Sequence, residues 1–60
     1  MKSKKLVILG AGNALIDIIE MALYYNMKNI EIYDDKLQNK KILDFQVLGT
    51  FEKGIKTNLG

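Results

Sequence analysis

The chain has 60 residues, of which 9 are Lys or Arg and 7 are Asp or Glu, and it contains neither His nor Cys. The absence of imidazole and thiol groups excludes histidine-based catalysis, thiol nucleophiles, zinc–thiolate sites and disulfide frameworks in these residues. Hydrophobic residues make up 48% of the chain and charged residues 27%, which is typical of one small globular domain that needs a core.

The first predicted element is a buried strand. Residues 5–9 read Lys-Leu-Val-Ile-Leu and stop at Gly10, and such a continuous apolar run is typical of a strand in a parallel sheet. The residues from Gly10 to Asn13 predict a tight turn, with Asn13 as the expected N-cap of a helix. We expect this helix over residues 14–25, because the stretch is too long for one strand and contains no Gly or Pro.

The predicted helix is apolar over most of its surface. Its polar residues Asn13, Asp17 and Glu20 fall on one narrow stripe at helical spacing. Contact with one face of a sheet does not cover the wide apolar surface that remains. We therefore expect the chain to self-associate or to pack against a further domain.

The helix is followed by a second strand. Asn26 is expected to end the helix in the left-handed conformation. Residues 29–33 alternate between polar and apolar, which predicts a strand nearer the edge of the sheet, and Asp34-Asp35 follows it. Strand, helix and strand within about 30 residues form a βαβ unit.

Beyond the Asp pair the pattern is weaker. Residues 36–41 predict a polar loop, and residues 40–43 and 46–48 predict two short extended segments. Thr50 is the expected cap of a short helix that Gly54 interrupts. No third full strand of a doubly wound sheet is expected. The fold class indicated is α/β, a truncated Rossmann-like βαβ unit with parallel strands and an additional short β/loop segment.

The candidate binding site combines the glycine turn with the Asp pair. Glycines let the backbone approach a phosphate group, and a helix N-terminus offers unpaired amides and a positive potential. Asp34 follows Gly12 at about the spacing of 20 residues at which a carboxylate binds ribose hydroxyls. No catalytic residue and no metal ligand is expected. The candidate substrate-binding residues are Gly10, Ala11, Gly12, Asn13, Asp34 and Asp35.

Other interpretations of these residues stay open at this stage. Gly10 and Gly12 also suit a plain turn between a strand and a helix, and an Asp pair at a strand end also suits solvated surface. A fragment of an NAD-binding oxidoreductase would need a third glycine, and Leu15 stands at that position.

Neither nucleic acid nor a membrane is an expected partner. The lysines gather in two groups, but the net charge is only +2 and no aromatic residues are interleaved with them. The longest nearly apolar stretch, residues 14–25, is shorter than the roughly 20 residues that cross a bilayer. We expect a cytoplasmic protein. The two lysine groups are residues 2, 4 and 5 and residues 36, 40 and 41.

Together these motifs resemble the N-terminal domain of the bacterial sugar acetyltransferases of the PglD/NeuD type, which modify UDP-bacillosamine precursors or sialic acid. Family members have a Lys-rich start, a strand with a glycine turn, a helix, a strand ending in Asp-Asp, and a later segment ending in Leu-Gly. The resemblance implies that the turn from Gly10 to Asn13 faces the diphosphate or the sugar, and that Asp34 and Asp35 face the uridine. The matching segments are residues 4–12, 32–35 and 42–49.

The resemblance also implies a division of labour. In this family, acetyl transfer from acetyl-CoA belongs to a C-terminal left-handed β-helix, whose hexapeptide repeats are absent from residues 1–60. The 60 residues would then be a single partial nucleotide-sugar-binding domain that needs no cofactor and is not catalytic alone. The parent protein would be an acetyl-CoA-dependent enzyme of polysaccharide biosynthesis. The alternative is a non-catalytic interaction or assembly module derived from that domain.

Overall fold

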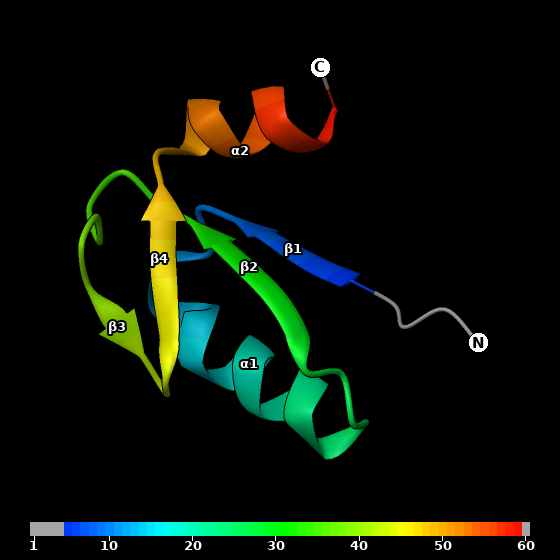
Figure 1. The fold of residues 1–60 in the computed structure, drawn as a ribbon. Coiled ribbons are helices and arrows are strands. Elements are labelled where there is room, and N and C mark those ends of the chain that lie inside the picture. Colours follow the sequence, from blue (N-terminus) through cyan, green and yellow to red (C-terminus); the bar gives the residue numbers. More distant parts are fainter. Residues whose placement is uncertain (1–4, 60) are drawn as a thin grey trace.

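The computed structural model describes residues 5–59, which form a four-stranded sheet with a helix on each face (Figure 1). Ile32 belongs to the core beneath the first helix, whereas its neighbour Tyr33 lies against the second helix. Successive strand residues point to opposite faces of a sheet, so the two helices lie on opposite faces. The elements are β1 (Lys5–Leu9), the 3₁₀ turn η1 (Gly12–Ala14), α1 (Leu15–Tyr24), β2 (Asn29–Tyr33), β3 (Lys41–Ile42), β4 (Phe45–Gly49) and α2 (Phe51–Asn58).

The α/β class and the parallel β1–α1–β2 unit are confirmed. The strand order in the sheet is β1-β2-β4-β3, with β1, β2 and β4 parallel and β3 antiparallel to β4. The pairing of β1 with β2 runs without a break from Lys5 opposite Asn29 to Leu9 opposite Tyr33.

Two expectations about the sheet are wrong. The strand β2 lies in the middle of the sheet and not near its edge, and the third parallel strand, β4, pairs with it. The alternation along β2 reflects the two covered faces, because Ile32 packs into the core while Glu31 binds Lys5 on the face of α2. The strand β4 was expected only as a short extended segment over residues 46–48, because only Phe45 and Val47 of its residues contact that core.

The helix α1 ends as expected but begins differently. Asn13 is not its N-cap, because the chain enters the helix through η1 and Ala14 occupies the cap position without a side-chain hydrogen bond. Asn26 has a φ of 63°, as predicted. The amide of Met27 donates to the carbonyl of Ala22 at 2.8 Å, which closes a Schellman motif at the end of the helix.

The helix α2 runs through Gly54, so the predicted interruption is wrong. Thr50 is the cap that was expected, since its Oγ1 accepts from the amide of Lys53 at 3.1 Å. A Cβ atom at Gly54 would lie 2.5 Å from Cγ of Tyr33 and 2.6 Å from Cδ2 of Leu9. The missing side chain therefore allows the helix to pack closely on the sheet.

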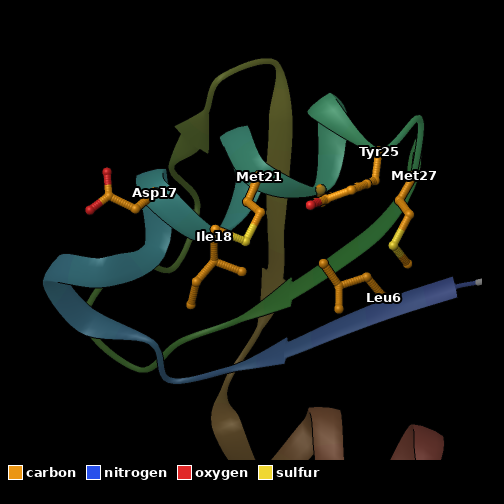
Figure 2. Close-up of a pocket in the computed structure, with 7 residues that line it drawn as sticks. Leu6, Asp17, Ile18, Met21, Tyr25 and Met27 are labelled. Atoms are coloured by element: carbon orange, nitrogen blue, oxygen red, sulfur yellow. The ribbon is translucent and has the colours of Figure 1, made fainter.

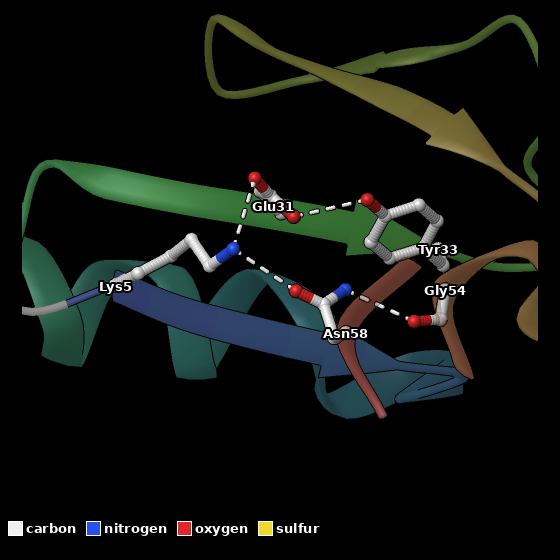
Figure 3. A network of polar contacts seen from close by, with 5 residues as sticks. All are labelled: Lys5, Glu31, Tyr33, Gly54 and Asn58. Atoms are coloured by element: carbon white, nitrogen blue, oxygen red, sulfur yellow. Dashed lines mark hydrogen bonds and ion pairs between the residues drawn. The ribbon is translucent and has the colours of Figure 1, made fainter. Parts of the chain in front are cut away.

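A polar network joins the last turn of α2 to β1 and β2 (Figure 3). Lys5 Nζ lies 3.5 Å from Glu31 Oε2 and donates to Asn58 Oδ1 at 3.0 Å, and Asn58 Nδ2 donates to the Gly54 carbonyl at 2.9 Å. The Tyr33 hydroxyl donates to Glu31 Oε1 at 2.9 Å. This bond, and after it the charge of Lys5, hold the pKa of Glu31 below 4.5 despite the opposing effect of burial. Burial, and then the bond to Glu31, raise the pKa of Tyr33 above 10.0.

Candidate functional site

The candidate site lies where the three parallel strands end. Gly10 follows β1, Asp34 follows β2, and Thr50 and Phe51 follow β4 at the start of α2. Parallel strands end at one edge of a sheet, so these residues come together although they are up to 41 positions apart. This edge is the usual ligand position in open α/β sheets.

The glycine turn presents three successive amide groups. The φ angle alternates along it, with values of 61° at Gly10, −73° at Ala11 and 60° at Gly12. Such alternation points consecutive N–H groups into one concavity that attracts anions. The amide of Gly10 donates to the carbonyl of Tyr33 at 2.8 Å, whereas the next three amides donate to no other residue within 5–59. The turn is therefore a cradle of the kind that holds phosphate oxygens.

Asp34 is held at the end of β2 and is only 6% exposed. Its amide donates to the carbonyl of Gly49 at 3.0 Å, and its Oδ1 accepts from the amide of Lys36 at 2.9 Å. These two bonds tie it to β4 and to the following turn. The side chain is thus a positioned carboxylate beside the glycine turn.

Asp35 has a structural task that the sequence did not indicate. Its Oδ1 accepts from the amide of Phe51 at 2.9 Å, in the first turn of α2. Together with Thr50 it satisfies amides that a helix N-terminus otherwise leaves unpaired. A carboxylate at this end of a helix is also favoured by the helix dipole.

Two adjoining hollows bring most of the predicted residues together. The first has a volume of about 250 Å³ and the second of about 310 Å³, and Gly12, Asp34 and Lys36 line both. Ala11 instead packs against the core. The first hollow is completed by Gly10, Asp35 and Phe51, and the second by Asn13 and Leu37.

Lys36 and Phe51 line the hollows but were not among the predicted site residues. The ring of Phe51 is 42% exposed and stands over the glycine turn, since a Cβ at Gly10 would lie 3.3 Å from its Cδ1. The sequence feature that could have identified Phe51 is the pattern of strand, Thr cap and helix over residues 45–58. This pattern forms a second strand-to-helix turn at the same edge of the sheet. Lys36 was interpreted as part of a solvated lysine group.

Leu15, where a dinucleotide fingerprint has its third glycine, is a core residue. It is 2% exposed and packs with Ile8, Ile19 and Ile32 under the sheet. The third glycine allows close packing of helix and strand in dinucleotide sites. Here the leucine side chain fills that space, which weakens the NAD hypothesis.

Neither a metal-binding cluster nor a membrane-spanning helix is present in the described part of the chain. Residues 5–59 contain no cluster of three or more Asp, Glu, His or Cys side chains arranged to hold a metal ion. No helix in the same range is long and apolar enough to cross a membrane. Of the lysine groups, Lys2 and Lys4 lie outside the described residues, and Lys40 and Lys41 are exposed.

The chain was also compared with known proteins. Protein-family models, curated proteins and solved structures gave no match. The binding chemistry of the site is therefore inferred from its own geometry and charge. The site combines three amides that donate to no other residue within 5–59, a buried carboxylate, an ammonium group and an exposed aromatic ring at one sheet edge.

Proposed function

We propose that the chain holds a nucleotide sugar of the UDP-sugar type at the carboxyl edge of its sheet. The observation that carries the proposal is the cradle of amides from Ala11 to Asn13, without acceptors in the described part of the chain, beside the buried carboxylate of Asp34. A cradle and a carboxylate at this spacing suit a diphosphate and the hydroxyl or N–H groups of a nucleoside. The resemblance to the PglD/NeuD type supports a UDP-sugar as the ligand.

The work of the chain is to position the ligand. The amides bind phosphate oxygens, and the ammonium group of Lys36 adds a positive charge at both hollows. The carboxylate of Asp34 accepts hydrogen bonds from the ribose or from uracil. Asp35 supports the same site indirectly, because its carboxylate accepts from the Phe51 amide and so positions the first turn of α2.

The chemical step belongs to another domain in this proposal. The chain is the N-terminal substrate-binding part of a bacterial sugar acetyltransferase, and acetyl transfer from acetyl-CoA takes place on a separate catalytic domain. Positioning alone lowers a barrier substantially, because it converts an encounter of two molecules into a reaction within one complex. UDP-sugars and acetyl-CoA are cytoplasmic metabolites, so the proposed place of work is the cytoplasm.

A titration of the isotope-labelled chain tests this function. Backbone amide shifts are followed while a UDP-N-acetyl sugar or, separately, NAD is added. We expect saturable shifts with the sugar nucleotide at Ala11, Gly12, Asn13 and Asp34. Shifts with NAD alone would favour the oxidoreductase fragment. If neither ligand shifts these amides in the folded chain, substrate binding is rejected. The alternative, a non-catalytic interaction or assembly module, would then be favoured.

A matched pair of variants tests the role of the carboxylate. Asp34→Asn keeps an oxygen that accepts from the Lys36 amide but removes the charge, so we expect roughly ten-fold weaker binding of the sugar nucleotide. The control is Asp44→Asn, in the exposed turn between β3 and β4, where the φ of 71° suits Asn equally well. If the two variants bind the sugar nucleotide with equal affinity, the carboxylate of Asp34 takes no part in binding.

A further inference from the structure

A third hollow lies away from the two at the candidate site, between α1 and the outer side of β1 (Figure 2). It has a volume of about 340 Å³ and is lined by Leu6, Ile18, Met21, Tyr25 and Met27, with Asp17 at one end. Figure 2 shows the side chains of Met21 and Tyr25 above Leu6, with Met27 at the end opposite Asp17. We call this surface the β1 groove.

The β1 groove adjoins a strand edge without a partner. β1 ends the strand order, so no strand within residues 5–59 pairs with its outer side. Gly10 donates its amide to β2, and because backbone groups alternate along a strand, those of Lys5, Val7 and Leu9 point away from β2. An apolar groove thus runs beside a row of backbone groups that have no partner strand within residues 5–59, which is a template for another strand.

The apolar area at the β1 groove supplies more than half of what a standard interface needs. Of the groove residues, Tyr25, Met21 and Ile18 are 68%, 65% and 37% exposed. Tyr24 does not line the groove, but its ring is in edge-to-face contact with that of Tyr25, with centroids 5.2 Å apart. At 150–250 Å² for an aromatic residue, Tyr25 together with Met21 and Ile18 leaves about 300 Å² of apolar surface in water. A standard interface covers about 800 Å² on each partner, of which roughly 60% is apolar.

We propose that the β1 groove is the interface of a two-fold homodimer. The β1 strands of two copies pair in antiparallel fashion, with Val7 opposite Val7 of the second copy and Lys5 opposite Leu9. The two sheets become one continuous sheet, and the two α1 helices lie side by side on the same face and cover Met21 and Tyr25. The arrangement closes on itself, because each copy presents the same surface.

The charges at the ends of the β1 groove favour this antiparallel arrangement. Asp17 lies at the end of the groove near the carboxyl end of β1. Lys28 follows Met27 at the other end, and both charged residues are exposed. Antiparallel pairing brings Asp17 of one copy to Lys28 of the other, twice in each dimer. A second copy therefore complements the groove in charge as well as in hydrogen bonding.

Sedimentation equilibrium of the full chain, from about 1 µM to about 500 µM, tests the dimer. We expect a monomer–dimer equilibrium whose dissociation constant rises at least roughly 100-fold in Met21→Lys, which places a charge in the covered groove. The matched control is Ile16→Lys, at a 50% exposed position on the other flank of α1, with a change of roughly three-fold or less. Circular dichroism of each variant confirms that the fold is kept.

A charge exchange tests the antiparallel register. Asp17→Lys and Lys28→Asp should each weaken the dimer roughly ten-fold, and the double variant should restore it to within roughly three-fold. A purely structural effect of either residue would not show this rescue. A chain that stays monomeric, forms open-ended assemblies, or loses its dimer with Ile16→Lys and not with Met21→Lys would overturn the proposal. The outcome is independent of the ligand titration, because the β1 groove shares no residue with the two site hollows.

Discussion

Gly54→Ala is the sharpest test of how α2 packs on the sheet. In an ordinary helix interior this exchange stabilises by about 1 kcal/mol, because glycine is the more flexible residue. Here the added Cβ would lie 2.5 Å from Cγ of Tyr33 and 2.6 Å from Cδ2 of Leu9. Carbon atoms normally approach to about 3.5–4.0 Å, so the overlap is about 1 Å on two sides.

The ring of Tyr33 has little room to yield. Tyr33 is 2% exposed and its hydroxyl is bound to Glu31, while Leu9 belongs to the five-residue strand that pairs with β2. Over-packing of this kind costs about 1–3 kcal/mol, and we place it near the upper value because two neighbours are involved. After the gain in helix propensity, the expected net loss is about 2 kcal/mol of the free energy of unfolding. For a chain of this size it corresponds to a decrease in Tm of roughly 8–16 °C.

Thermal and urea unfolding, followed by circular dichroism, measure this loss. The control is Gly49→Ala, whose Cβ would lie 2.6 Å from Cδ of Lys53, an exposed and flexible side chain that can turn away. We expect the control to change the free energy of unfolding by less than about 1 kcal/mol. If Gly54→Ala unfolds at the same temperature as the unaltered chain or above it, the packing argument is refuted.

Two further predictions concern the cap and the polar network. Thr50→Ala removes the oxygen that accepts from the Lys53 amide and should cost about 1 kcal/mol in urea unfolding, whereas Thr50→Ser should cost little. The pKa of Glu31 is lower in the folded chain than its ordinary 4.5, so its stabilising contribution is present above that pH and is lost as the pH falls through the folded value. The pKa of Tyr33 is raised, so its contribution is present below pH 10.0 and is lost as the pH rises. Tyr33→Phe should move the pKa of Glu31 upward in an NMR titration. It should also reduce the loss of stability in acid and abolish the loss of stability in alkali that is due to residue 33. An unchanged pKa of Glu31 would contradict the hydrogen bond.

The local elements were predictable from neighbouring residues. The apolar run of β1, the left-handed Asn26 and the Thr50 cap each depend on groups within a few positions along the chain. The same holds for the glycine turn, where positive φ angles favour glycine because it has no Cβ. The order of strand, turn, helix, strand and Asp pair therefore followed from the sequence, and with it five of the residues that line the two hollows.

The start of α1 shows the limit of local reasoning. Asn13 is a good cap by residue type, yet its side chain makes no cap bond, because the positive φ at Gly12 leads the chain into a 3₁₀ turn first. Asp35 shows the same limit, because its hydrogen-bond partner lies far away in the sequence. The sequence placed it at the candidate site, where it lines the first hollow, but gave no sign that its Oδ1 accepts from the amide of Phe51, a residue 16 positions away.

What the sequence by itself determined is the βαβ order and the positions of the glycine turn and the Asp pair within it, because each depends on spacing along the chain. Only the tertiary structure decided that β2 is central, that β4 is a third parallel strand, and that α2 continues through Gly54. In each case the partner comes from a distant segment, and pairing or close packing with it outweighs the local preference. The same long-range pairing brings Phe51 and Lys36 to the site and leaves the outer edge of β1 beside an apolar groove.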